Sequence, residues 1–96
     1  MKLRYTPAAL AELVAVLDTI AEQSPTGARR VQARIKAMTE LLLRHPHAGQ
    51  STNLPGLRRI AATPYPYVLF YEPHADEVIV IGIRHAACDP ASMPDA

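Results

Sequence analysis

Apolar residues recur at helical spacing in the first half of the chain. A helix is expected to begin at Thr6-Pro7, because threonine is a good N-cap residue and proline is tolerated at the first helical position. The apolar side chains that follow are separated by short, helix-like steps and place one stripe on a helix of about four turns. This stripe consists of Leu10, Leu13, Val14, Leu17, Ile20 and Ala21.

A second helix is expected after Ser24-Pro25, which repeats the same start signal. Its apolar residues again follow steps of three and four, and they are Ala28, Val31, Ile35, Met38 and Leu42. The helix is expected to end before Pro46 and Gly49. Because the turn between the two helices is short, they are predicted to form an antiparallel hairpin.

Short segments with a period of two predict the strands. Met1–Tyr5 alternates apolar and polar residues and is predicted to be an edge strand. Three further strands are expected over Leu54–Thr63, Tyr67–Glu72 and Glu77–Arg84, and their short connections imply an antiparallel meander. Since Val78–Ile81 is apolar at every position, the last strand is expected to be central and covered on both faces. The predicted fold is α+β, with a helical hairpin on a mainly antiparallel sheet in the order β-α-α-β-β-β.

Length and composition are those of one packed domain. The chain has 96 residues, of which 49% are hydrophobic and 20% charged, which disfavours disorder and fibrous repeats. We expect the domain to cover residues 1–89 and residues 90–96 to form a flexible tail. The longest apolar run, Val78–Ile83, is far shorter than a membrane span, and the N-terminus lacks the apolar stretch of a signal peptide. A cytoplasmic protein without membrane contact is therefore expected. Cys88 is the only cysteine, so no internal disulfide is possible.

The formal net charge of +1 conceals two halves of opposite sign. Residues 1–60 hold nine Lys and Arg against four Asp and Glu, a balance of +5, whereas residues 61–96 hold one against five, a balance of −4. The second helix carries much of the positive charge, but it lacks the interleaved aromatic residues of a nucleic-acid interface. A protein partner therefore fits this distribution better than a polyanion does.

Several motifs, taken in order, resemble the RelE/ParE superfamily of toxins from bacterial type II toxin-antitoxin systems. The resemblance covers nearly the whole chain. It includes Tyr5–Ala9 after the opening strand, Arg29–Val31 in the second helix, and Gly56–Arg59. The most specific part is Pro66–Tyr71, followed by an apolar strand that ends in the segment His85–Pro90.

The resemblance implies a toxin that a cognate antitoxin binds, with a segment that folds on contact. RelE-like members cleave messenger RNA on the ribosome, whereas ParE-like members poison DNA gyrase and lack the full nuclease set. The lysine cluster of the nucleases is missing here, because Lys2 and Lys36 are the only lysines. We therefore expect a ParE-like gyrase inhibitor that needs no cofactor and contacts DNA only through its antitoxin. A non-toxic module that merely binds antitoxin is a further alternative.

If the chain is instead a metal-independent ribonuclease, it needs an acid, a base and cations at the phosphate. His85, Arg59, Arg84 and Tyr71 are the candidates, and His85 could equally well have only a structural role. Arg58 and Arg59 are neighbours on one strand, so their side chains are expected on opposite faces. Where the resembling pattern often has arginine, this chain has Cys88, which removes a further cation.

Contacts with the antitoxin are expected to use arginine and aromatic side chains. Arg30 and Arg34, one helical turn apart, could meet an acidic antitoxin segment. The remaining candidates lie on the strands and are Arg58, Arg59, Tyr67, Arg84 and His85. The histidines and Cys88 have no metal-motif spacing, so no metal site is predicted.

Overall fold

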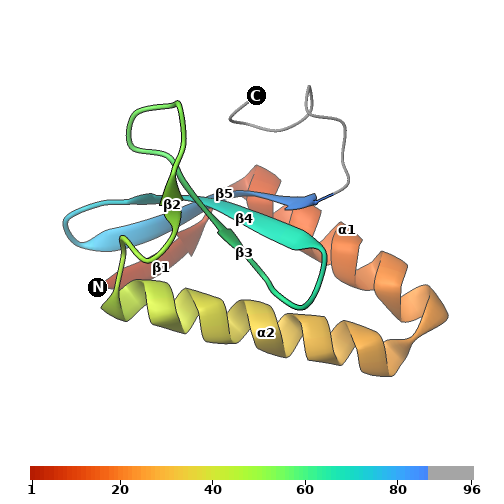
Figure 1. Ribbon diagram of the computed structural model, residues 1–96. Helices are drawn as coiled ribbons and strands as arrows, with labels where there is room; N and C mark the ends of the chain where they lie inside the picture. The colour runs from red at the N-terminus through yellow and green to blue at the C-terminus, as the bar shows by residue number, and fades with distance from the viewer. Residues whose placement is uncertain (87–96) are drawn as a thin grey trace.

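Two helices cover one face of a five-stranded mixed sheet in the computed structural model, which describes residues 1–86 (Figure 1). The element order confirms the predicted β-α-α-β-β-β arrangement, with one additional short strand. The elements are β1 (Lys2–Tyr5), α1 (Pro7–Gln23), α2 (Pro25–Arg44), β2 (Gln50–Ser51), β3 (Arg58–Ala61), β4 (Tyr67–Pro73) and β5 (Glu77–His85).

Both helices begin where their capping residues predict. The Thr6 hydroxyl accepts a 3.1 Å hydrogen bond from the Ala9 backbone N–H, and the Ser24 hydroxyl accepts one of 3.0 Å from Gly27. These side chains satisfy N–H groups that have no partner within the first helical turn. Ser24 also ends α1 by donating its own N–H to the Ile20 carbonyl, so one residue makes the whole turn of the hairpin.

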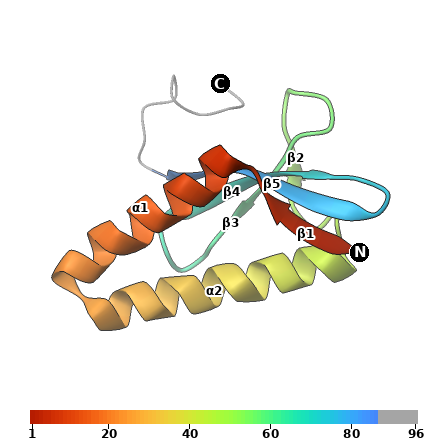
Figure 2. The same ribbon diagram turned by 180° about the vertical axis from the view of Figure 1, so that it is seen from behind.

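The strand order β1-β5-β4-β3-β2 confirms that β5 is central and β1 is an edge strand. The strands β3, β4 and β5 form the expected antiparallel meander, and β1 pairs with β5 in parallel, with Leu3 opposite Val78. This pairing joins the first strand to the last one in the described chain, as the view from behind shows (Figure 2).

A bulge in β5 changes the face on which its last residues lie. Tyr71 pairs with Val80 and Phe70 pairs with Gly82, so Ile81 is an extra residue without a partner on β4. We call the side covered by α1 and α2 the helix face, and the opposite side the outer face. Because of the extra residue, Ile83 points to the helix face, where it joins the main core cluster.

The two helices contribute unequally to the core. Five residues of α2 are buried, namely Val31, Ile35, Met38, Thr39 and Leu42. In α1 only Ala9 is fully buried, while Leu13, Val16, Leu17 and Ile20 pack against the core with part of their surface. Leu10 and Val14 remain 51% exposed. The apolar stripe predicted for α1 therefore packs against the core with only part of its width, because the apolar band is wider than the contact with the sheet.

Two strand predictions also need correction. The expected strand Leu54–Thr63 is shorter, since only Arg58–Ala61 forms β3. Pro55 and Gly56 interrupt the pattern, and Gly56 has a φ of 78°, which glycine adopts readily. Residues Val78–Ile81 are not buried on both faces, because Ile79 and Ile81 on the outer face are only half-buried.

Some predictions fall outside the described residues. They concern Cys88, the domain boundary at residue 89 and the tail 90–96. Within residues 1–86, neither helix has both the length and the apolar character that a membrane span requires.

Candidate functional site

Arg59 lies on the outer face of β3, above an aromatic ring. Pairing across the sheet places Arg59 beside Phe70 and Phe70 beside Gly82. The Cζ atom of Arg59 is 5.4 Å from the centroid of the Phe70 ring, a cation–π distance. Phe70 is itself buried and forms a small apolar cluster with Leu57 and Val68. An apolar base therefore lies beneath the guanidinium.

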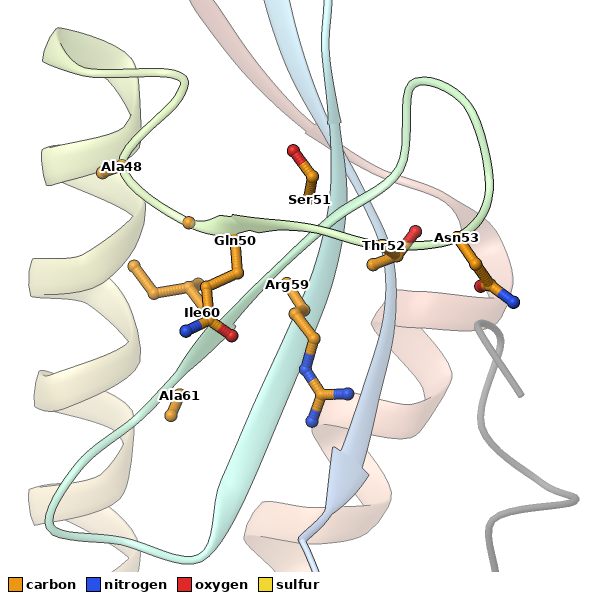
Figure 3. Close-up of a pocket in the computed structure, with 9 residues that line it drawn as sticks. Ala48, Gln50, Ser51, Thr52, Asn53, Arg59, Ile60 and Ala61 are labelled. Atoms are coloured by element: carbon orange, nitrogen blue, oxygen red, sulfur yellow. The ribbon is translucent and has the colours of Figure 1, made fainter.

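A polar cleft opens beside Arg59, where the short β2 meets β3. Its volume is about 650 Å³, and residues 48–53 and 59–61 line it. Figure 3 shows the Arg59 side chain between Gln50 on one side and Thr52 on the other. A guanidinium with amide and hydroxyl neighbours can hold an anionic group or a peptide group by hydrogen bonds. This cleft is the candidate site for a ligand or partner.

Arg58 lies on the opposite face from Arg59, as predicted for neighbours on a strand. Its guanidinium donates to the Gly49 carbonyl from Nη2 at 2.8 Å and from Nε at 3.2 Å. It also donates to the His47 carbonyl at 3.0 Å and to the Ser51 hydroxyl at 3.1 Å. Arg58 therefore anchors the segment between α2 and β2, the same segment that forms one wall of the cleft.

Tyr71 is completely buried on the helix face of β4. Its hydroxyl accepts a 2.9 Å hydrogen bond from the Gly49 backbone N–H. A Cβ atom at position 49 would lie 2.6 Å from that hydroxyl and 2.5 Å from the Arg59 carbonyl oxygen, so only glycine fits there. Tyr71, which the sequence offers as a candidate only if the chain is a ribonuclease, fixes the backbone of the cleft wall through this bond.

Arg84 lies on the outer face of β5 by its register, and its guanidinium forms an ion pair with Glu12 of α1. The exposed fractions of the two side chains are 24% and 31%, so the pair is partly shielded from water. Glu12 also accepts a 3.4 Å hydrogen bond from the Ile83 backbone N–H, on the edge of β5 that extends beyond β1. The contact thus joins α1 to the part of β5 that β1 does not cover.

His85 and Tyr67 lie together on the helix face at the end of the sheet. Their rings make an edge-to-face contact with centroids 5.4 Å apart. They line a hollow of about 280 Å³ together with Ala15, Val16 and Thr19 of α1. The bulge in β5 is responsible for this placement, because it turns His85 to the face opposite Arg59 and Arg84.

The two arginines expected to meet an antitoxin on α2 differ in their surroundings. Arg30 is exposed. The Nε atom of Arg34 donates a 2.9 Å hydrogen bond to the Thr63 carbonyl in the turn between β3 and β4. Arg34 therefore helps to hold this turn against α2, and its remaining guanidinium nitrogens are the part that a partner could contact.

Shifts in pKa occur at the other edge of the sheet, on β1 and β5. Burial raises the pKa of the Tyr5 hydroxyl. A hydrogen bond from Arg4 lowers the pKa of Glu77, against an opposing effect of desolvation and with support from the charges of Arg4, His74 and Lys2. Within residues 1–86, no three His, Cys, Asp or Glu side chains are grouped closely enough to hold a metal ion.

Comparison with known proteins assigns the chain to a family. The family described as "ParE toxin of type II toxin-antitoxin system, parDE" matches residues 3–90. The chain belongs to the ParE toxin family. A curated relative, Toxin RelE2 of Caulobacter vibrioides, is 36% identical over 83 residues, which are 86% of this chain and 92% of the relative. The chain is thus a toxin of the RelE/ParE superfamily, and membership implies a cognate antitoxin.

Solved structures agree with this fold. The chromosomal ParDE system from P. aeruginosa has a chain with a TM-score of 0.75 and 23% identity, covering 88% of this chain and 95% of that one. The isolated E. coli RelE toxin has a TM-score of 0.64 and 19% identity, covering 94% of this chain and 88% of that one. At these identities the likeness shows the fold of this ParE-family toxin.

Two residues important to the site were not predicted from the sequence of this ParE-family toxin. No local signal in the sequence indicates that Glu12 of α1 meets Arg84, which lies 72 residues further along the chain. Gly49 was predicted only to end a helix. The Pro46-to-Gly49 stop does indicate a tight backbone here, but the partner Tyr71 could not be inferred from it.

Proposed function

We propose that this ParE-family toxin arrests growth by binding DNA gyrase in the cytoplasm, and that its cognate antitoxin neutralises it. The observation that carries the proposal is the separation of the candidate nuclease residues. Arg59 and Arg84 lie on the outer face, whereas Tyr71 and His85 lie on the helix face. The match to the ParE family supports the same target.

Ribonuclease chemistry needs an acid, a base and a cation within hydrogen-bond reach of one phosphate. The Tyr71 hydroxyl is buried and bonded to the Gly49 N–H, and Arg84 is paired with Glu12. His85 contacts Tyr67 on the face opposite the Arg59 cleft. This arrangement favours a protein inhibitor over an enzyme.

The charge distribution supports protein partners as well. The exposed side of α2 carries Arg29, Arg30, Lys36 and Arg44 with Glu40 as its only acid. An acidic segment of the antitoxin would be attracted to this helix, and complementary charge mainly speeds association. The polar cleft beside Arg59 is a second candidate contact for the same partner or for the target.

A gyrase supercoiling assay tests the target. Purified toxin, added in increasing amounts to gyrase and relaxed plasmid, is expected to inhibit supercoiling, and antitoxin is expected to restore it. Arg59→Ala tests the contribution of the cleft. Arg29→Ala on α2 is the control, because it removes one positive charge outside the cleft. Full supercoiling at large toxin excess would contradict the proposed target.

The alternative targets are resolved by two further measurements. Primer extension on a translated message would reveal cuts placed by codon if the toxin were a ribosome-dependent endonuclease, and His85→Ala would then abolish them. Expression of the toxin without antitoxin should arrest growth. Normal growth of these cells would instead favour the non-toxic antitoxin-binding module.

A further inference from the structure

The loop between β2 and β3 carries an exposed leucine. Leu54 is 43% exposed, whereas Leu57 at the end of the same loop is buried against Val68 and Phe70 on the outer face. The other large apolar side chains exposed within residues 1–86 lie elsewhere, at the first residue and on α1. Figure 1 shows the loop rising from the sheet on the side away from α2. An apolar side chain is therefore presented where neither helix covers it.

Hydrogen bonds within the loop hold this leucine in place. The backbone N–H of Leu57 donates to the Leu54 carbonyl at 3.2 Å and closes a turn over the two residues between them. These residues, Pro55 and Gly56, are typical of a type II turn, and Gly56 has the positive φ that its third position requires. The Thr52 hydroxyl accepts a 3.1 Å bond from the Leu54 N–H and donates one of 3.0 Å to the Leu57 carbonyl. A loop bonded in this way loses little conformational freedom when a partner binds it.

The part of the chain around Leu54 is positively charged. Residues 41–71 contain no aspartate or glutamate and three arginines, namely Arg44, Arg58 and Arg59. The next acid along the chain is Glu72 of β4, whose carboxylate lies 3.2 Å from the Nε2 atom of His74. A contacting surface that carries Asp or Glu would therefore be attracted to the loop, and one that carries Lys or Arg would be repelled.

Two hollows adjoin the loop. Thr52 and Asn53 belong to the wall of the Arg59 cleft. A second hollow, of about 330 Å³, has an apolar part that is formed by Leu54, Pro55, Leu57 and Pro73. A partner that encloses Leu54 can therefore direct acidic groups toward Arg59 in the cleft and apolar atoms into the second hollow.

Two other occupants fit this surface less well. A second copy of the chain would bring two positively charged loops together. Nucleic acid would be attracted by the charge, but Arg58 already donates to the Gly49 and His47 carbonyls, and binding along phosphates needs several available cations. Leucine also has no donor or acceptor for a base edge. A protein pocket that is apolar inside and acidic at its border matches both the leucine and the charge.

We propose that the loop of residues 52–57 inserts Leu54 into an apolar pocket of the target protein, and that Asp or Glu residues border this pocket. The identity of the partner as gyrase rests on the proposed function, whereas the shape and charge of the loop do not. The contact is separate from the antitoxin contact expected on α2. Loss of the leucine should therefore impair inhibition of the target and leave binding of the antitoxin unchanged.

Two variants at position 54 test the apolar contact in the gyrase supercoiling assay. Leu54→Ser removes the anchor, so the toxin concentration for half-inhibition should rise about tenfold or more. Leu54→Met should inhibit nearly as well as wild type, because it keeps an apolar side chain of similar volume. Val14→Ser, at a residue of α1 that is 51% exposed, is the control and should inhibit normally. Because position 54 is exposed, its variants should keep the wild-type circular dichroism and melting temperature.

A matched pair of charged variants tests the border of the pocket. Leu54→Arg and Leu54→Glu both lose the apolar anchor and differ in the sign of the charge that replaces it. The arginine variant should inhibit less than wild type but more than the glutamate variant, because acidic residues at the border attract the first and repel the second. Equal inhibition by the two variants would contradict an acidic border. Stronger inhibition by Leu54→Arg than by wild type would assign the loop to nucleic acid instead.

Thr52→Val tests whether the loop presents the leucine in a fixed position. The variant keeps Leu54 but removes the hydroxyl that bonds to the loop backbone. Inhibition should weaken by a smaller factor than in Leu54→Ser, since a looser loop loses more conformational freedom on binding. Inhibition equal to that of wild type would show that these hydrogen bonds do not position the leucine for the target.

Growth arrest by the toxin expressed without antitoxin is a readout that does not depend on the identity of the target. Leu54→Ser should arrest growth less than wild type and should bind purified antitoxin with wild-type affinity. If wild type arrests growth but leaves gyrase active, the proposed target is wrong, and weaker arrest by Leu54→Ser would still support the loop. A wild type that affects neither gyrase nor growth would overturn both proposals.

Three results would overturn the loop contact alone. The first is inhibition and growth arrest by Leu54→Ser at the wild-type level, and the second is an equal loss in Val14→Ser. The third is weaker antitoxin binding by Leu54→Ser, which would assign the loop to the antitoxin. Sedimentation that shows a toxin dimer abolished by Leu54→Ser would assign it to a second copy instead.

Discussion

The backbone N–H of Gly49 donates a 2.9 Å hydrogen bond to the hydroxyl of Tyr71, a contact between a loop and the centre of the sheet. Tyr71 is fully buried, and Gly49 is buried as well. The bond fixes the segment between α2 and β2, which Arg58 also holds by donating to the Gly49 and His47 carbonyls. A hydrogen bond to a buried core residue therefore fixes the wall of the Arg59 cleft.

Tyr71→Phe tests this bond. The variant leaves the buried Gly49 N–H without its acceptor, so the free energy of unfolding should fall by about 1–3 kcal/mol. Urea denaturation followed by circular dichroism measures the change, and Tyr65→Phe at a half-buried position is the matched hydroxyl deletion, with a smaller expected effect. Equal losses in the two variants would show that the bond to Gly49 adds little.

Alanine at the two loop glycines should destabilise the toxin for different reasons. At Gly49 the new Cβ would approach backbone and ring atoms to 2.5–2.9 Å, so Gly49→Ala should cost about 2 kcal/mol or more. At Gly56 nothing lies within 4 Å, and only the φ of 78° opposes the substitution, so Gly56→Ala should cost about 1 kcal/mol. Thermal unfolding of both variants measures this order, and a reversed order would contradict the tight fit at position 49.

The ion pair between Glu12 and Arg84 should stabilise the contact of α1 with β5. Glu12→Gln keeps an oxygen that can accept from the Ile83 N–H but removes the charge, whereas Glu12→Ala removes both. The alanine variant should therefore be the less stable one. A double-mutant cycle of Glu12→Gln with Arg84→Gln is expected to give a coupling of about 1 kcal/mol, as for partly exposed pairs. Additive effects of the two substitutions would mean that the ion pair makes no net contribution.

The pair of Arg4 and Glu77 should make stability depend on pH. Their hydrogen bond of 2.9 Å lowers the pKa of Glu77 in the folded protein. A lowered folded-state pKa means that the pair stabilises the protein above the ordinary carboxyl pKa of about 4.3, and that this contribution is lost as the pH falls through the lowered value. Wild type should therefore exceed Arg4→Met in unfolding free energy at neutral pH, with a smaller difference in acid once Glu77 is protonated in the folded protein. A difference that grows in acid would contradict the assignment.

Much of the fold could be predicted because its signals are local. Thr6-Pro7 and Ser24-Pro25 mark the helix starts by residues that bond within one turn. The strand β2 could not be predicted, since Gln50 and Ser51 are polar and form a strand only because β3 lies beside them. The exposed part of α1 was hidden for a related reason. The apolar band of α1 is wider than the surface by which the helix contacts the sheet. The sequence therefore does not indicate which apolar residues of the band are buried.

The site was harder to predict, because it depends on which face each strand residue occupies. The opposite orientations of Arg58 and Arg59 follow from strand geometry alone. The placement of Arg84 and His85 depends on the extra residue Ile81, which reverses the alternation after it. No feature of an unbroken apolar run such as Val78–Ile81 reveals a bulge, so the division of the candidate nuclease residues between two faces appears only in the folded chain.

The position of β5 has a consequence for the time at which the toxin forms. This strand contacts β1, β4 and both helices, yet it is the last strand of the described chain to be synthesised. A nascent chain that has reached only β4 has the helical hairpin and most of the other strands, but not the strand that joins β1 to the rest. Contacts between residues far apart in sequence also form slowly. The fold of the toxin is therefore expected to be completed only after translation has passed β5.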